Sequence, residues 1–380
     1  MTGQGHSRSR LLVICIAVAL FAITFSIATS GDIDAVLDEE LPTWSEDKNV
    51  LITGANAGLG MATALRIARA GTAKTIIMAC RNPTKCKAAM QDAMSVLPEG
   101  ATTRVQTVEL DLSQRDSVVQ GSYAITEALS EEATADKGIV PHLDVLINNA
   151  GVAFAWNSKE FVEGVETHMA INHLSHFLLT HRLWPNLLAA TTVSAPRVVH
   201  VASITAIGSW RDASLGWKNP NPRHDMGRWY NFLDCIRYYS QSKRANLMQT
   251  WELHKRYYEA AGVISVAAHP GYTRSEIFSK VQIAGSTSWI KRMVMTKSYM
   301  NMSPDDGATM QLMAAFAPSS IVPSGSHVVP KYWTAGSPVL IPKLLCGFSL
   351  HYNSFSEEDT ANLWDTSMKE LGIEEFGMLE

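Results

Sequence analysis

The sequence predicts a doubly wound α/β fold, in which a parallel sheet carries helices on both faces. Two observations carry this prediction. The apolar run Val50 to Ile52 leads directly into a glycine-rich stretch, Thr53 to Gly60, and further short apolar runs then alternate with helical patterns. Strands separated by helices need crossover connections, so the sheet should be parallel, with ligands bound at the carboxyl ends of its strands.

Composition excludes several classes of protein. The 380 residues carry a net charge of −4 and 18% charged residues, so nothing indicates binding to nucleic acid. The five cysteines show no CxxC spacing, which argues against a zinc site and predicts mostly free thiols. We expect one catalytic domain, residues 48–380, that includes a C-terminal extension.

The N-terminus has the pattern of a membrane-targeting segment. Arg8 and Arg10 precede an uncharged apolar run at 11–28, and acidic residues follow it. Residues 1–30 are therefore expected to be a signal anchor or a signal peptide, with residues 31–47 as an acidic linker. An anchor predicts membrane association, at the endoplasmic reticulum or another endomembrane, with a translocated catalytic domain; cleavage predicts secretion or delivery to an organelle.

The expected elements follow in order. Helices are expected over 61–70, 83–97, 113–130, 167–190 and 239–260, and strands over 50–52, 75–79, 104–110, 143–147, 197–201 and 264–268.

The glycine loop suits a dinucleotide. Gly54 permits a sharp turn, Gly58 permits close approach to a phosphate, and Gly60 permits close packing of the next helix. The first turn of that helix would offer N–H groups to a pyrophosphate. A plain strand-to-helix connector can show the same pattern, so the rest of the chain must decide.

The second strand ends in Cys80-Arg81-Asn82, where an NAD site would carry a carboxylate. The Arg81 guanidinium suits the 2′-phosphate of NADP(H), and Lys85 adds positive charge nearby. The alternative is a solvated surface arginine.

Two further strand ends carry candidate contacts. Asp111-Leu112 follows the third strand, where Asp111 could accept from the adenine amino group or cap the next helix. Asn148-Asn149-Ala150-Gly151 follows the fourth strand and would keep the backbone close to the adenine ribose, although an ordinary turn looks the same.

The reactive residues come next. Ser203 follows the fifth strand, and Tyr239 and Lys243 lie four apart on one helix face. A tyrosine with a pKa of about 10 is a poor base, so the Lys243 ammonium should lower the pKa of Tyr239. Tyr239 could then exchange a proton with a substrate oxygen that Ser203 binds. A Tyr-x-x-x-Lys spacing arises often by chance, and its place in the βα series is what gives it weight.

Several histidines, including His168, His173, His176 and His181, lie on one expected helix. They lack a carboxylate or cysteine pattern around them, so no metal site is predicted.

From about Asn49 to Thr273 the chain resembles the short-chain dehydrogenases/reductases, which have a Rossmann-type fold. The motifs are Thr-Gly-x-x-x-Gly-x-Gly at 53–60, Asn-Asn-Ala-Gly at 148–151, the set Ser203, Tyr239 and Lys243, and His269-Pro270-Gly271-Tyr272-Thr273. The resemblance implies Asn172 as the fourth catalytic residue. The cofactor-binding residues it implies are Gly54, Asn56, Gly58, Leu59, Gly60, Arg81, Asn82, Asp111, Leu112, Asn148, Ala150, Gly151, Tyr239, Lys243, Pro270, Gly271 and Thr273.

Within that family the chain is similar to the retinol dehydrogenase and WW-domain oxidoreductase branch. The similar segments are 79–82, 171–180, 303–308 and the tail at 361–367. We therefore expect an NADP(H)-dependent oxidoreductase that interconverts an alcohol and a carbonyl on a lipophilic substrate such as a retinoid, steroid or fatty aldehyde. The alternatives are a double-bond reductase resembling protochlorophyllide reductase and a non-catalytic, membrane-tethered NADP(H) sensor. The oligomeric state stays open, with a homodimer as one option.

The segment between Ser203 and Tyr239 is long for the family. This insert, at about 204–238, contains several tryptophans and prolines. Together with residues 277–302 it could form a lid over a bulky apolar substrate, or it could be a surface elaboration.

Overall fold

A computed structural model describes residues 31–130, 140–153, 161–208, 228–273, 302–331, 338–341 and 355–378. In this part of the chain an eight-stranded sheet has the order β10-β9-β8-β7-β4-β1-β2-β3. Strands β1 to β9 of this sheet run parallel, and β10 pairs antiparallel with β9. The sheet strands are β1 (Asn49–Thr53), β2 (Thr75–Cys80), β3 (Arg104–Glu109), β4 (Val145–Asn148), β7 (Arg197–Val201), β8 (Ile264–Ala268), β9 (His327–Pro330) and β10 (Pro338–Ile341). The doubly wound fold is confirmed.

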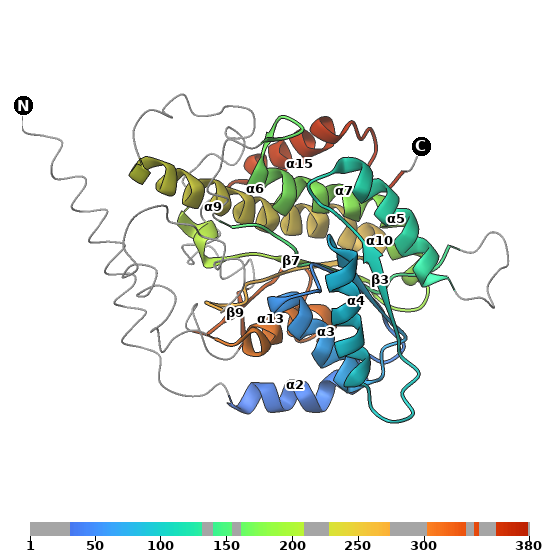
Figure 1. The fold of residues 1–380 in the computed structure, drawn as a ribbon. Helices are drawn as coiled ribbons and strands as arrows, with labels where there is room; N and C mark the ends of the chain where they lie inside the picture. The colour runs from blue at the N-terminus through green and yellow to red at the C-terminus, as the bar shows by residue number, and fades with distance from the viewer. Residues whose placement is uncertain are drawn as a thin grey trace, which may run out of the picture.

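Helices cover both faces of the sheet, as Figure 1 shows. One layer contains α2 (Gly31–Trp44), α3 (Gly58–Ala70), α4 (Pro83–Ser95) and α13 (Pro304–Phe316). The other contains α5 (Arg115–Leu129), α6 (Thr167–Met169), η2 (Ala170–Leu174), α7 (Ser175–Arg182), α8 (Trp184–Ala190), α9 (Arg228–Leu253), η4 (His254–Tyr258), α10 (Glu259–Ala261) and α15 (Glu357–Leu371). A hairpin of β5 (Phe161–Val162) and β6 (Val165–Glu166) precedes α6, and the 3₁₀ turn η3 (Ile204–Gly208) follows β7.

The core has two halves because strand side chains alternate between the faces. Val50 and Ile52 of β1 pack in the cluster under α3 and α13, whereas Leu51 packs in the cluster under α5 and α7. All five residues of β1 are buried, as expected for a central parallel strand.

Residues 31–44 differ from the expected linker. They form α2, in which Leu37 and Leu41 are buried against the core and Asp38 pairs with Arg66 of α3 at 2.6 Å. From residue 37 on, the exposed positions of α2 include Asp38 and Glu39, so its two buried leucines give a weak signal in the sequence.

The expected helix at 167–190 is divided in the structure. It contains the π-helical turn η2 and the separate segments α6, α7 and α8. The helix expected from Tyr239 begins earlier, at Arg228, so the end of the predicted insert belongs to α9.

Several expectations lie outside the described residues. They are the apolar run at 11–28, the central part of the insert at 209–227 and most of the segment at 277–302. Within the described residues, no helix combines the length and apolar character needed to cross a membrane.

Candidate active site

The glycine loop joins β1 to the start of α3. Gly54 and Gly58 have positive φ angles of 68° and 54°, which L side chains rarely adopt. A Cβ on Gly60 would lie 2.6 Å from the carbonyl oxygen of Gly54 and 2.5 Å from Nδ2 of Asn149. Neither the side chain of Ala57, the N-cap of α3, nor an acidic residue in its first turn satisfies the N–H groups there. The loop therefore fits a pyrophosphate at the helix N-terminus.

Half-buried Asn56 and Leu59 lie in the same loop. Leu59 reaches across to the turn after β8: a Cβ built on Gly307 would contact Leu59, Thr273 and the carbonyl oxygen of Pro270. Gly271 in that turn has a φ of 77°. The structure thus brings the predicted contacts at 270–273 next to the glycine loop.

Arg81 lies at the end of β2, where a 2′-phosphate would be recognised. Its side chain is exposed, and in the described part of the chain it makes no hydrogen bond or ion pair. Asn82 instead caps α4, because its Oδ1 accepts from the N–H of Lys85 at 2.9 Å.

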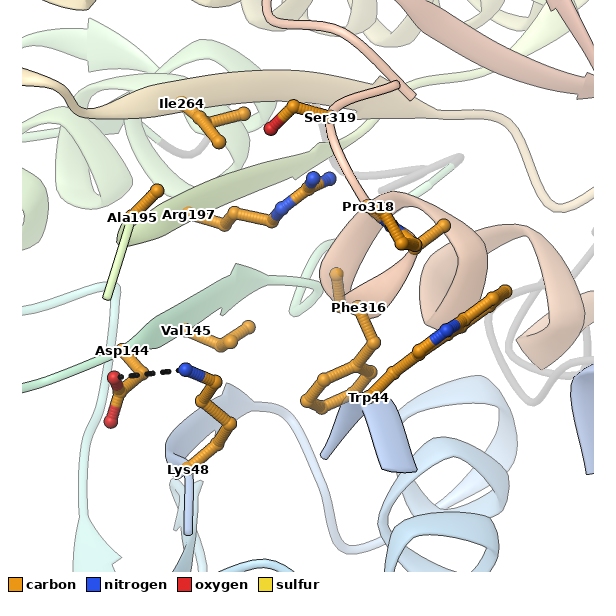
Figure 2. A pocket seen from close by; sticks show the side chains of 12 residues that line it. Trp44, Lys48, Asp144, Val145, Ala195, Arg197, Ile264, Phe316, Pro318 and Ser319 are labelled. Atoms are coloured by element: carbon orange, nitrogen blue, oxygen red, sulfur yellow. Dashed lines mark ion pairs between the residues drawn. The ribbon is translucent and has the colours of Figure 1, made fainter. Parts of the chain in front are cut away.

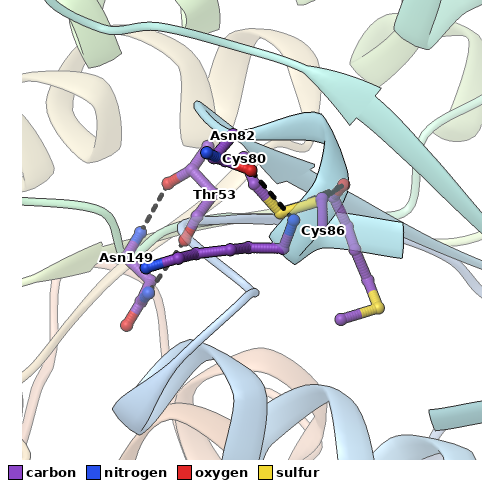
Figure 3. Close-up of a disulfide and its surroundings, with 7 residues drawn as sticks. Thr53, Cys80, Asn82, Cys86 and Asn149 are labelled. Atoms are coloured by element: carbon purple, nitrogen blue, oxygen red, sulfur yellow. Dashed lines mark hydrogen bonds between the residues drawn. A yellow bond between two sulfur atoms is a disulfide. The ribbon is translucent and has the colours of Figure 1, made fainter. Parts of the chain in front are cut away.

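A disulfide between Cys80 and Cys86 closes this loop (Figure 3). The two Cα atoms are 5.8 Å apart, and both residues are buried. The prediction of mostly free thiols is wrong for this pair, because a spacing of six residues has no disulfide signature until β2 and α4 bring the ends together.

Asp111 does not cap α5, whose N-cap is Gln114. Its Oδ1 accepts from the N–H and Oγ–H of Ser113 at 2.9 and 2.7 Å, so it orders the turn after β3. Leu112 is buried, and its carbonyl oxygen accepts from Ser175 Oγ at 2.6 Å.

The turn after β4 is tied to the glycine loop. A Cβ on Gly54 would lie 3.0 Å from Cα of Ala150. Asn149 Nδ2 donates to the carbonyl oxygen of Thr53 at 2.8 Å (Figure 3). Asn148 is buried, and its Nδ2 donates to Thr180 Oγ1 at 3.2 Å, so it supports the turn from inside the protein.

Ser203 and Tyr239 form a hydrogen-bonded pair between β7 and α9. Ser203 Oγ accepts from the N–H and Oγ1–H of Thr205 at 3.3 and 3.1 Å. A hydroxyl has two acceptor sites and one donor hydrogen, so the Ser203 hydrogen is left for Tyr239 or a substrate oxygen.

Burial raises the pKa of Tyr239 to about 12, although the hydrogen bond with Ser203 acts in the opposite direction. The predicted lowering by Lys243 is therefore not found in this structure, where desolvation dominates. The Lys243 Nζ lies 5.9 Å from the centre of the Tyr239 ring.

Lys243 is buried, and burial lowers its pKa to about 8. Its Nζ donates to the carbonyl oxygen of Val201 at 2.9 Å. A Cβ on Gly151 would lie 3.6 Å from this Nζ and 2.9 Å from Oδ1 of Asn172, so these three residues share one site.

Asn172 lies in η2, and its side chain binds both Val152, after β4, and Ser242 of α9. Its Oδ1 accepts from the N–H of Val152 at 2.8 Å, and its Nδ2 donates to the carbonyl oxygen of Val152 and to Ser242 Oγ, each at 2.9 Å. Ser242 Oγ donates in turn to the carbonyl oxygen of Tyr239 at 2.8 Å.

Thr53, His176 and Ser242 also belong to the site, although the motifs in the sequence predict no role for them. Thr53 Oγ1 accepts from the N–H groups of Asn149 and Ala150 at 3.0 and 2.9 Å. Its place just before Gly54 is the signal that could have found it; Ser242 and His176 carry no such signal.

Each of the histidines expected to lie on one helix has a hydrogen-bonding partner within the protein. His168 Nδ1 is 2.7 Å from Glu166 Oε1, and its ring meets that of Tyr239 edge-on at 6.2 Å. His173 Nε2 is 3.0 Å from Ser367 Oγ of α15, and His181 Nδ1 accepts from the N–H of Gly377 at 2.9 Å.

A cavity of about 170 Å³ lies at the amino ends of β4, β7 and β8, opposite this site (Figure 2). Arg197 enters it, and its Nη1 donates to the carbonyl oxygen of Ala314 at 2.9 Å, in the last turn of α13. Lys48 and Asp144 pair across its rim at 3.7 Å. A cation at a helix C-terminus stabilises the helix dipole, so Arg197 has a structural explanation.

Comparisons with known proteins identify the family of this chain. Residues 48–214 match the family model for short chain dehydrogenases. Human retinol dehydrogenase 11 is 31% identical over 288 residues, which are 74% of this chain and 76% of that protein. The chain belongs to the short-chain dehydrogenase family.

Three further proteins are similar to this chain as well. Mouse retinol dehydrogenase 14 is 31% identical over 87% of this chain and 88% of its own length. Human retinol dehydrogenase 13 is 36% identical, and the match spans 63% of each chain. The crystal structure of an uncharacterized protein from Mycobacterium Paratuberculosis has a TM-score of 0.59 at 29% identity and covers 88% of this chain and 96% of its own. The chain is thus an oxidoreductase-family member that resembles retinol dehydrogenases, and the family uses NAD(H) or NADP(H).

Proposed function

We propose that this protein is an NADP(H)-dependent oxidoreductase that interconverts a lipophilic alcohol and its carbonyl, as expected of a retinoid, steroid or fatty aldehyde. The observation that carries the proposal is the convergence of Ser203, Tyr239, Lys243 and Asn172 beside a glycine loop whose helix N-terminus is free to bind an anion. The names of the relatives support a retinoid-like substrate.

The cofactor, when bound, supplies or accepts the hydride. In the reductive direction the Ser203 hydroxyl donates to the substrate carbonyl oxygen. Tyr239 is protonated at neutral pH, because burial raises its pKa to about 12, and its Oη–H donates the proton to that oxygen. The Lys243 ammonium stabilises the phenolate that is left. In oxidation the same groups act in reverse.

Arg81 supports the choice of NADP(H). It is an exposed guanidinium at the end of β2, without a protein partner among the described residues, and it can bind a 2′-phosphate through two parallel hydrogen bonds. The apolar run at 11–28 supports a membrane-associated enzyme, at the endoplasmic reticulum or another endomembrane, that meets lipophilic substrates there.

A substrate screen tests the proposal. Purified protein is mixed with NADPH and with all-trans-retinaldehyde, a steroid ketone or a long-chain aldehyde, and the loss of NADPH absorbance is followed for wild type and Tyr239→Phe. We expect turnover of at least one carbonyl by wild type and a loss of about 10²- to 10⁴-fold in the variant, with NADPH binding retained.

Three outcomes would contradict the proposal. Equal rates in the two proteins would remove Tyr239 from the mechanism. A product that keeps its carbonyl but loses a carbon–carbon double bond would instead favour a double-bond reductase, and NADPH binding without turnover of any compound would favour a sensor.

A further inference from the structure

His176 lies between the cofactor loop and the catalytic asparagine. It is in the first turn of α7 and is 1% exposed. Its Nε2 is 2.9 Å from Thr53 Oγ1, at the end of β1, and its Nδ1 is 3.2 Å from the carbonyl oxygen of Asn172. One imidazole therefore contacts both halves of the site.

The hydrogen bonds of His176 have a fixed direction. Burial lowers the pKa of His176 to about 4, so the ring is neutral at physiological pH, with one N–H and one acceptor nitrogen. A carbonyl oxygen can only accept, so Nδ1 carries the hydrogen and donates to Asn172. Nε2 is then the acceptor, and the Thr53 hydroxyl donates to it.

Among the described residues, the Thr53 hydroxyl has no better acceptor for its hydrogen than Nε2 of His176. The alternative acceptor, the carbonyl oxygen of Ile147, is 3.4 Å away. The two acceptor sites of Thr53 Oγ1 are taken by the N–H groups of Asn149 and Ala150. These bonds use every donor and acceptor site of the Thr53 hydroxyl. The turn at Asn149 and Ala150 therefore depends on how this hydroxyl is oriented.

The other end of the network reaches the proton donor. Asn172 binds Val152 and Ser242 through its side chain, and Ser242 binds the backbone of Tyr239. The π-helical turn that presents Asn172 ends at Leu174, immediately before α7, so His176 closes this turn onto β1.

We propose that His176 is a positioning residue, which couples the order of the cofactor loop through Thr53 to the placement of Asn172 and of the helix that carries Tyr239. The proposal rests on the proposed function, because it assigns one nitrogen to cofactor binding and the other to turnover.

Three substitutions separate the two bonds. The Nδ2 of His176→Asn replaces Nδ1 and keeps the bond to Asn172, whereas the Oε1 of His176→Gln replaces Nε2 and keeps the bond to Thr53. His176→Leu removes both. His181→Leu is the matched control, because His181 is a buried histidine on the same helix whose bond goes to Gly377.

The dissociation constant of NADPH, the kcat for all-trans-retinaldehyde and the Tm are measured for each protein. Leaving a buried group without its partner costs about 1–3 kcal/mol, which is about 5- to 150-fold. We expect His176→Leu to weaken NADPH binding and lower kcat by such factors. His176→Asn should mainly weaken NADPH binding, and His176→Gln should mainly lower kcat. His181→Leu should lower the Tm but leave both other quantities within twofold.

A folded His176→Leu with both quantities within twofold of wild type would overturn the proposal, as would equal losses in His181→Leu. If His176→Leu does not fold, the Asn and Gln variants decide, and wild-type values in both would overturn it. If wild type turns over no carbonyl, the proposed function fails, and the NADPH dissociation constants still test the link to Thr53.

Discussion

At the scale of single residues, burial acts on Tyr239 and Lys243 in opposite directions. Both side chains are almost fully enclosed, so each favours its neutral form, which raises the pKa of Tyr239 to about 12 and lowers that of Lys243 to about 8. Near neutral pH the pair is therefore a phenol beside an ammonium, which suits proton donation to a carbonyl oxygen.

This difference predicts a pH dependence. Above pH 8 Lys243 loses its proton while Tyr239 keeps its own, so stabilisation of the developing phenolate is lost. We expect kcat/KM for carbonyl reduction, measured from pH 6 to 10, to fall by up to tenfold per pH unit above about pH 8.

The Tm supplies the control for this profile. Between about pH 8 and the unfolded pKa near 10.5, the unfolded chain binds more protons at Lys243 than the folded protein does, so this group makes folding more favourable as pH rises. The loss of the Lys243 proton therefore does not destabilise the fold in this pH range, so unfolding caused by this group does not explain a loss of rate. A flat profile to pH 10 would show that the Lys243 proton is not needed.

Arg81 gives a prediction about cofactor choice. Arg81→Ala should weaken NADPH binding about tenfold and leave NADH binding unchanged, because only the 2′-phosphate meets this side chain. Lys87→Ala, an exposed cation on α4, is the control and should change neither. Titrations with both cofactors at low and high salt would measure this, and equal losses for NADH and NADPH would contradict it.

At the scale of elements, α2 extends the domain beyond the sheet. Leu37 and Leu41 pack in the same cluster as α3 and α13, and Arg66 joins these helices through Asp38 and Thr309. Residues 31–44 are thus part of the folded unit.

Leu37→Ala should lower the free energy of unfolding by about 2–5 kcal/mol, because Leu37 is fully buried. Glu39→Ala, on the exposed face of α2, should change it by less than about 0.5 kcal/mol. Urea denaturation of both variants measures this. Similar small effects would mean that α2 is not packed on the domain in solution.

Five of the six strands expected from the sequence share one property. Each of β1, β2, β4, β7 and β8 is buried on both faces, so it reads as a mostly apolar run next to a helical pattern, whereas β3, the sixth, is mostly half-buried. Strands β9 and β10 were missed because they are short and each contains a proline.

At the scale of the whole molecule, the predicted site residues lie along one edge of the sheet because parallel strands end there. The glycine loop, Asn148 to Gly151 and Ser203 follow neighbouring strands β1, β4 and β7, which the order of the sheet places side by side. Residues that act through tertiary contacts could not be found this way. His176 meets Thr53 across 123 positions of sequence, and Cys86 meets Cys80 only after β2 and α4 pack.

In the proposed function, hydride passes between a nicotinamide cofactor and a substrate carbonyl, with Tyr239 as the proton donor. Transfer of label from NADPH deuterated at nicotinamide C4 tests it most directly, with all-trans-retinaldehyde as the substrate and mass spectrometry of the product alcohol. We predict one deuterium on the carbinol carbon with wild type, for one of the two C4 positions, and almost no labelled alcohol with Tyr239→Phe. Consumption of NADPH that yields unlabelled alcohol from both C4-deuterated forms, or equal labelling by the two proteins, would contradict it.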